Sequence, residues 1–233
     1  MKAAVALIAL LAATSSVQAT LYDASADFSA VNNPNGVWSY GTIGDANAAV
    51  RIFQAYNDVS IYSGIDYWYG AEGQVSHNGT SNPITSNTVT WPASTLSIVN
   101  TAASHASAVR FTAPIAGTYD ISGSFFVLSS IGLSDVGIAA NYDTLFTLDN
   151  RAISLFGVSS LTGTASFSTS VFLRQSDIVD FAVGGPFLNE RDYTGLEALV
   201  SLKDSTIPVP GTLVLLGGGV VLVLKRRKRG VSR

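Results

Sequence analysis

Alternation of apolar and polar residues at every second position is the feature of this sequence that most limits its fold. It is clearest in residues 119–125, 166–173 and 179–183, where apolar side chains alternate with small or polar ones. A period of two gives a strand with one buried face and one solvated face. Further β-branched and aromatic segments predict strands at residues 50–53, 89–91, 108–112, 144–148, 152–156 and 196–202.

Turn-forming residues separate these segments, at positions 116–117, 149–150, 162–163, 175–177 and 184–186. Many short strands divided by such turns are typical of an all-β fold, and we predict a jelly-roll-like two-sheet β-sandwich. The chain of 233 residues has room for one such domain, at residues 20–207. Clusters of Asn, Pro and Gly interrupt residues 20–100, so we expect long loops and few strands there.

Composition restricts the function. The chain has no cysteine, which excludes disulfides, thiol chemistry and cysteine-based metal sites. Residues 20–207 contain six basic residues and all sixteen acidic ones, a net charge of about −10. Because contacts to phosphate need Lys and Arg, this charge argues against binding of nucleic acid.

The first 19 residues are typical of a secretory signal peptide, which we expect to form a short helix. Lys2 supplies the positive charge, residues 3–13 are apolar, and Ala19 ends a small-x-small cleavage site. The pattern predicts export of the residues that follow.

Residues 208–233 form a second targeting segment. An uncharged run of 13 residues, 212–224, precedes five consecutive basic residues, which predicts a hydrophobic helix that inserts in the membrane. The basic stop-transfer residues are Lys225, Arg226, Arg227, Lys228 and Arg229. Because basic flanking residues remain in the cytoplasm, we expect residues 20–207 to lie outside it.

This tail resembles the PEP-CTERM sorting signal of Gram-negative bacteria in its Pro-x-Pro motif (Pro208, Val209 and Pro210), its short apolar segment and its basic end. The resemblance implies export across the inner membrane, with an exosortase-type enzyme as the processing partner. Val209 stands where the family usually has Glu. Two outcomes therefore stay open: retention as a membrane-anchored protein, or cleavage and release to the cell surface or extracellular matrix.

Three fragments of the body, residues 33–41, 109–119 and 176–184, resemble the extracellular β-sandwich modules of many PEP-CTERM proteins. The resemblance covers most of residues 28–202 and implies a jelly-roll akin to carbohydrate-binding modules. It carries no assigned activity, so it transfers no catalytic residue.

The sequence contains none of the short motifs of α/β-hydrolases, zinc proteases or phosphate-binding loops. Its two histidines, His77 and His105, lie in polar segments typical of exposed loops. A glycosidase needs two carboxylates across a cleft, and the available acids have no diagnostic spacing: Glu72, Glu190, Asp192 and Glu197. We therefore expect a non-catalytic protein.

Two oxygen-rich clusters contain the ligand types that Ca²⁺ prefers: Asn141 with Asp143, and Asn189 with Glu190 and Asp192. Neither cluster has the spacing of a calcium-binding loop, so plain turns are the favoured interpretation. We expect no cofactor.

Aromatic residues give the strongest indication of a ligand. Tyr62, Tyr67, Trp68 and Tyr69 cluster in a Gly-rich segment, and flat rings stack on the apolar faces of sugars. The competing interpretation, which we favour on composition, is that these rings fill the sandwich. Asn78-Gly79-Thr80 matches an N-glycosylation sequon, a match that arises often by chance in so polar a chain.

Three functions stay open. The first is an exported, non-catalytic envelope or matrix protein whose sandwich binds exopolysaccharide. The second is a secreted hydrolase that acts on polysaccharide. The third is a structural matrix subunit that self-associates through its sheet edges.

Overall fold

The computed structural model describes residues 20–44, 52–102, 105–128, 135–141, 143–147, 161, 163–184 and 193–205. Within these residues the chain forms sixteen β-strands and no helix, so the prediction of an all-β fold is confirmed. Accordingly, no helix that is long and apolar enough to cross a membrane occurs in this described part. The two expected terminal helices lie outside it, as do the Pro-x-Pro motif and the five basic stop-transfer residues.

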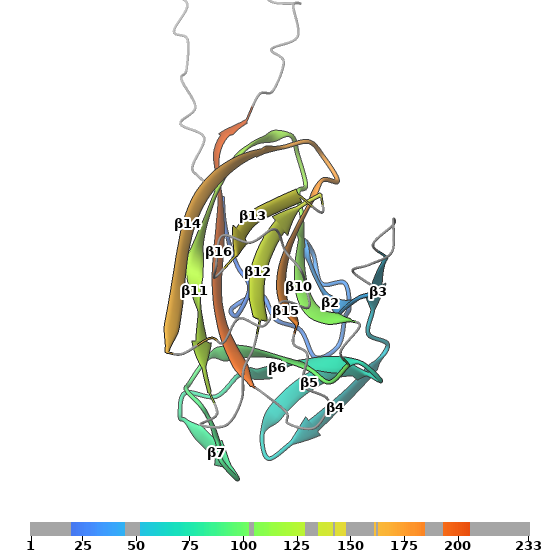
Figure 1. Ribbon diagram of the computed structural model, residues 1–233, viewed down its shortest axis with the longest axis vertical. Coiled ribbons are helices and arrows are strands. Elements are labelled where there is room, and N and C mark those ends of the chain that lie inside the picture. The colour runs from blue at the N-terminus through green and yellow to red at the C-terminus, as the bar shows by residue number, and fades with distance from the viewer. Residues whose placement is uncertain are drawn as a thin grey trace, which may run out of the picture.

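The strands form two large antiparallel sheets and one small hairpin (Figure 1). The first sheet has the order β14 (Thr164–Leu173), β11 (Gly117–Val127), β16 (Thr194–Ser205), β9 (Thr95–Asn100), β6 (Gly73–Asn78), β5 (Ile65–Gly70) and β4 (Asp58–Tyr62), with β1 (Leu21–Asp23) also paired to β16. The second sheet has the order β13 (Asp143–Thr147), β12 (Asp135–Ala140), β15 (Ile178–Gly184), β10 (Ala106–Thr112), β2 (Trp38–Ile43) and β3 (Phe53–Ala55). The hairpin consists of β7 (Ile84–Ser86) and β8 (Val89–Trp91).

Aromatic side chains from both sheets meet in one core. Trp38, Phe111 and Phe181 of the second sheet and Tyr119 and Phe125 of the first are all completely buried. The centroid of the Phe111 ring lies 5.4 Å from that of Trp38 in its own sheet and 5.6 Å from that of Tyr119 in the other. Burial of each such ring contributes about 1.5–3 kcal/mol, so this layer holds the sheets together as a sandwich.

The alternation read from the sequence reappears as alternating burial. In β14, Ala165 and Phe167 are buried, whereas Thr164, Ser166 and Ser168 are exposed. The segments expected at 89–91, 108–112, 144–148 and 196–202 coincide with or overlap β8, β10, β13 and β16. The segment expected at 50–53 overlaps β3 at its last residue, and 152–156 lies outside the described residues.

The expectation of few strands before residue 100 is wrong, because nine strands lie between Leu21 and Asn100. β2 shows why: all six of its residues are buried, so its two faces do not alternate. One of the Asn, Pro and Gly clusters that we expected to be a loop also holds β2 in place. The amide of Asn33 donates hydrogen bonds to the carbonyls of Tyr40 (2.7 Å) and Tyr56 (2.9 Å) and accepts one from the Tyr40 N–H (2.9 Å).

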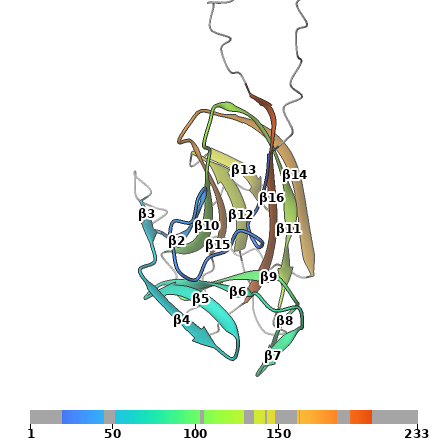
Figure 2. The same cartoon turned by 180° about the vertical axis from the view of Figure 1, so that it is seen from behind.

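The described chain begins and ends at the same end of the sandwich. β1 pairs with the middle of β16, in the register Leu21 to Ser201, and the Leu202 N–H donates to the carbonyl of Thr20 (3.1 Å). The β4–β5 hairpin and the β7–β8 hairpin lie at the opposite end (Figure 2).

Candidate functional site

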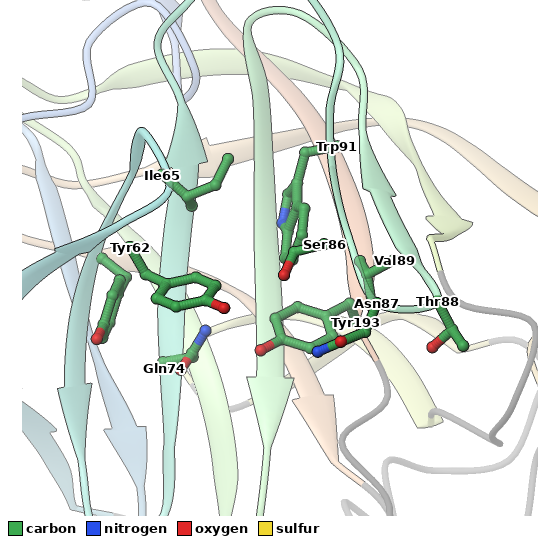
Figure 3. Close-up of a pocket in the computed structure, with 10 residues that line it drawn as sticks. Tyr62, Ile65, Gln74, Ser86, Asn87, Thr88, Val89, Trp91 and Tyr193 are labelled. Carbon is green, nitrogen blue, oxygen red and sulfur yellow. The ribbon is translucent and has the colours of Figure 1, made fainter.

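A pocket of about 420 Å³ lies between the β4–β5 hairpin and the β7–β8 hairpin. Figure 3 shows Tyr62, Ile65 and Gln74 on one side, and the β7–β8 residues with Tyr193 on the other. The described residues that line the pocket are Tyr62, Ile65, Tyr67, Gln74, Ser86, Asn87, Thr88, Val89, Trp91 and Tyr193.

The first wall follows from a tight turn. Ser63 and Gly64 connect β4 to β5 with φ angles of 52° and 88°, and two positive φ values define a type I′ turn, whose twist matches that of a hairpin. The turn fixes the register, so Tyr62 is the direct partner of Ile65. Since side chains alternate along a strand, Tyr67 lies on the same face as Ile65. Tyr62 is 57% exposed at the pocket.

The opposite wall contains two aromatic rings. Trp91 ends β8 and Tyr193 precedes β16, and their rings meet edge to face with centroids 5.0 Å apart. The indole N–H of Trp91 donates to the hydroxyl of Ser97 (2.9 Å), which is 2.7 Å from the hydroxyl of Ser76. Trp91 is thereby held against the outer face of β6 and β9, and Tyr193 rests on it.

Asn78 holds the base of the β7–β8 hairpin. Its side chain is completely buried, and its amide donates to the carbonyls of Asn82 (2.9 Å), Trp91 (3.1 Å) and Pro92 (2.9 Å). Its carbonyl accepts hydrogen bonds from the N–H (3.0 Å) and hydroxyl (2.7 Å) of Thr80. The sequon at Asn78 therefore has a structural role, because a buried amide with three partners cannot receive a glycan.

Backbone contacts connect the β7–β8 hairpin and Tyr193 to the segment that follows β11 of the first sheet. The Thr90 N–H donates to the carbonyl of Leu128 (3.4 Å), and the Leu128 N–H donates to the carbonyl of Tyr193 (3.0 Å). Ile65, Val89 and Trp91 form a small apolar cluster beneath the pocket. The pocket is therefore built on strands and held from several sides. Such rigid support is typical of a preformed binding site.

The lining combines aromatic faces with free amides. All ten described lining residues are uncharged. Within the described part of the chain, the side chains of Gln74, Asn87 and Tyr193 make no hydrogen bond, so their polar groups are available to a ligand. An apolar floor, exposed rings and a few convergent amides suit a molecule with both apolar faces and hydroxyl groups.

The four aromatic residues named from the sequence separate into two groups. Tyr62 and Tyr67 line the pocket, and Tyr69 lies beside Tyr67 with ring centroids 5.5 Å apart. Trp68 lies on the opposite face of β5, is 6% exposed and donates from its indole N–H to the carbonyl of Ser29 (2.6 Å). The inclusion of Trp68 as a ligand-binding residue is therefore wrong, since its ring packs in the sandwich core.

The remaining candidates have structural surroundings. His77 is on β6, not in a loop, and is half-buried with its ring 4.9 Å from that of Phe28. Burial lowers the pKa of His77 below its ordinary value. Among the acids, Glu72 lies in the β5–β6 turn and Glu197 accepts a hydrogen bond from the hydroxyl of Ser124 (3.2 Å). Glu190 and Asp192 lie outside the described residues.

Asn141 occupies a turn, as the sequence favoured. It has a φ of 48°, and its side-chain oxygen accepts the N–H of Ile178 (3.0 Å). Among the described residues, no group of three His, Cys, Asp or Glu side chains is placed to hold a metal ion. Asn189 and its acidic neighbours lie outside the described residues.

The chain matches no protein-family model and no curated protein. Among solved structures, it is similar to a family 35 carbohydrate-binding module from Clostridium thermocellum (10% identity, 81% of this chain and 100% of the module, TM-score 0.29). It is also similar to the CBM22-1 xylan-binding domain of Paenibacillus barcinonensis Xyn10C (11%, 80% and 95%, TM-score 0.30). A tailspike domain of bacteriophage CBA120 matches over 72% of this chain but 19% of its own (8%, TM-score 0.31). At these TM-scores the likenesses assign neither a family nor a ligand.

Proposed function

We propose that this protein binds a neutral glycan, without acting on it, in the pocket between the β4–β5 and β7–β8 hairpins. The observation that carries the proposal is the lining itself. Tyr62, Tyr67 and Tyr193 offer aromatic surface, and Gln74 and Asn87 offer amides without partners in the described chain. A sugar ring has apolar C–H faces that stack on such rings and hydroxyls that bind such amides.

The charge of the pocket and of the body supports a neutral ligand. The ten described lining residues are uncharged, and residues 20–207 have a net charge of about −10. A glycan rich in carboxylate or sulfate groups would meet like charge over the body and no cation among the described lining residues. Hexoses or pentoses without acidic groups meet neither obstacle.

The sequence supports a location for this activity. The signal peptide and the PEP-CTERM-like tail favour export in a Gram-negative bacterium, with the body outside the cytoplasm, anchored or released after processing by an exosortase-type enzyme. The sandwich is jelly-roll-like in this proposal, because the chain passes repeatedly between the two sheets from β10 to β16. Together these features suggest a protein of the envelope or of an exopolysaccharide matrix.

The direct test is a binding titration of purified full-length protein in detergent against a panel of neutral polysaccharides. Replacement of Tyr62→Ala removes the most exposed ring of the pocket and should weaken binding about tenfold. Phe172→Ala is the matched control, since Phe172 is 54% exposed on β14, at the other edge of the first sheet. It should bind like the unmodified protein.

Two results would overturn the proposal. One is the absence of binding to every neutral polysaccharide in the panel. The other is equal affinity of the Tyr62→Ala and unmodified proteins, which would place any bound glycan elsewhere on the molecule.

A further inference from the structure

The aromatic surface of the pocket continues beyond its edge. Tyr69 is 39% exposed and follows Tyr67 by two positions, so both rings project from the same face of β5. Their centroids are 5.5 Å apart, and the planes are inclined by 50°. Tyr67 belongs to the pocket lining, whereas Tyr69 does not.

Gln74 connects the pocket to this extension. It is the direct cross-strand partner of Tyr69 in the β5–β6 register, and it also lines the pocket. Its amide makes no hydrogen bond in the described chain. An unpartnered amide therefore lies between the enclosed part of the site and an exposed ring on the same sheet face.

A row of rings along a strand matches a particular kind of ligand. Positions two apart on a strand are separated by about 7 Å, so the rings of Tyr67 and Tyr69 follow one another along β5, with their planes inclined by 50°. A single sugar fills one such surface, whereas a chain of sugars presents an apolar face at each unit. The spacing of the rings along β5 therefore suits a chain of sugars better than a single sugar.

We infer that Tyr69, with Tyr67 and Gln74, forms a second subsite, so that the site takes an oligosaccharide rather than a single sugar. This inference rests on the proposed function and specifies its ligand. The enclosed pocket holds one sugar unit, and the next units extend along the outer face of β5 over Tyr67 and Tyr69.

The competing explanation is that Tyr67 and Tyr69 only cover the backbone of β5. Cross-strand and same-face ring contacts stabilise sheets without any ligand. In that case removal of the Tyr69 ring would change stability but would not change how affinity depends on the length of a glycan.

The test compares affinity along ladders of neutral sugars. Full-length protein in detergent is titrated calorimetrically with β-1,4-linked glucose, β-1,4-linked xylose and α-1,4-linked glucose series of one to six units. For the series that binds, affinity of the unmodified protein should rise about tenfold between the shortest and longest members, as expected for one added stacking contact. Tyr69→Ala should abolish this rise and leave the affinity for the shortest member within about twofold.

Tyr69→Phe is the second variant, since it keeps the ring and removes only the hydroxyl. Its affinity should rise with glycan length as that of the unmodified protein does. Loss of folding in Tyr69→Ala would lower the affinity for every member of the series, and the unchanged affinity for the shortest member excludes it. A rise that persists in Tyr69→Ala, or no rise in the unmodified protein, would overturn this inference alone. Absence of binding to every series would instead overturn the proposed function.

Discussion

At the scale of single residues, Asn78 is the side chain on which the shape of the pocket most depends. It is completely buried and makes five hydrogen bonds to the segments that flank the β7–β8 hairpin. Asn78→Ala would leave the carbonyls of Asn82, Trp91 and Pro92 without this donor. At about 1 kcal/mol per hydrogen bond, the free energy of unfolding should fall by about 3 kcal/mol.

Urea unfolding measures this loss. Thr88→Ala is the matched control, because Thr88 is exposed at the hairpin tip and its side chain makes no hydrogen bond in the described chain. The control should stay within about 0.5 kcal/mol of the unmodified protein. Equal stabilities for the two variants would show that Asn78 does not hold the hairpin.

His77 predicts a pH dependence of stability. Burial lowers its pKa in the folded protein, although the carboxylates of Asp66 and Asp23 act in the opposite direction. The unfolded chain, with an imidazole pKa of about 6.5, therefore binds more protons than the folded one. The stabilising contribution is complete above about pH 6.5 and is lost as the pH falls through the lower folded pKa.

Comparison with His77→Gln isolates this contribution. Between pH 7.5 and pH 5, the urea midpoint of the unmodified protein should fall further than that of the variant, because the variant has no imidazole at position 77 to protonate. If both proteins lose the same stability between these pH values, protonation of His77 does not oppose folding.

The tryptophans show how far residue identity predicts a site. Trp68 and Trp91 are both nearly buried, but Trp68 packs between the sheets and Trp91 lies under the pocket on the outer face. The Tyr67-Trp68-Tyr69 run does identify β5 as aromatic. Which ring faces the pocket depends on the strand register, and Trp91 and Tyr193 join the lining only through packing between distant segments.

At the scale of elements, β11 lies between the two other long strands of the first sheet, β14 and β16, and pairs with both. Gly123 permits that pairing, because a Cβ there would collide with the carbonyl of Glu197 and the ring of Phe167. Gly123→Ala should therefore reduce the free energy of unfolding by about 3 kcal/mol, from overpacking and an unfavourable φ.

Gly36→Ala separates the collision from the backbone strain. Gly36 has a φ of 58°, and no atom lies within 4 Å of the position of an added Cβ. Its substitution should cost about 1 kcal/mol from φ alone. Chemical unfolding that gave equal costs for the two glycines would mean that the strands can move apart at Gly123.

Strands with one solvated face were predictable, and fully buried strands were not. β14 alternates in sequence and in burial, whereas β2 is buried at every position and carries no such pattern. β5 and β6 were missed for a related reason. Their outer face is partly covered by the β7–β8 hairpin, so the sequence there reads as a mixture of rings and small polar residues.

At the scale of the whole molecule, the two hairpins that line the pocket lie at the opposite end of the sandwich from the two ends of the described chain (Figure 1). A protein held by its tail would therefore present the pocket away from the point of attachment. Because the chain contains no cysteine, a single introduced thiol can be labelled at one chosen end.

Thr88→Cys and Thr20→Cys place that thiol at exposed positions at the pocket and at the opposite end. A bulky maleimide on the first should reduce glycan affinity at least tenfold by steric exclusion, and the same label on the second should leave it unchanged. Calorimetric titration of both labelled proteins measures the two glycan affinities. Equal inhibition, or inhibition by the Thr20 label alone, would place the binding surface at the wrong end.

The central claim is tested most directly by a crystal structure of the protein with a bound neutral oligosaccharide. The account predicts electron density for a sugar ring between Tyr62 and Tyr193, within hydrogen-bonding distance of Gln74 or Asn87, and further units over Tyr67 and Tyr69. Density for the oligosaccharide on another surface, with this pocket empty, would contradict it.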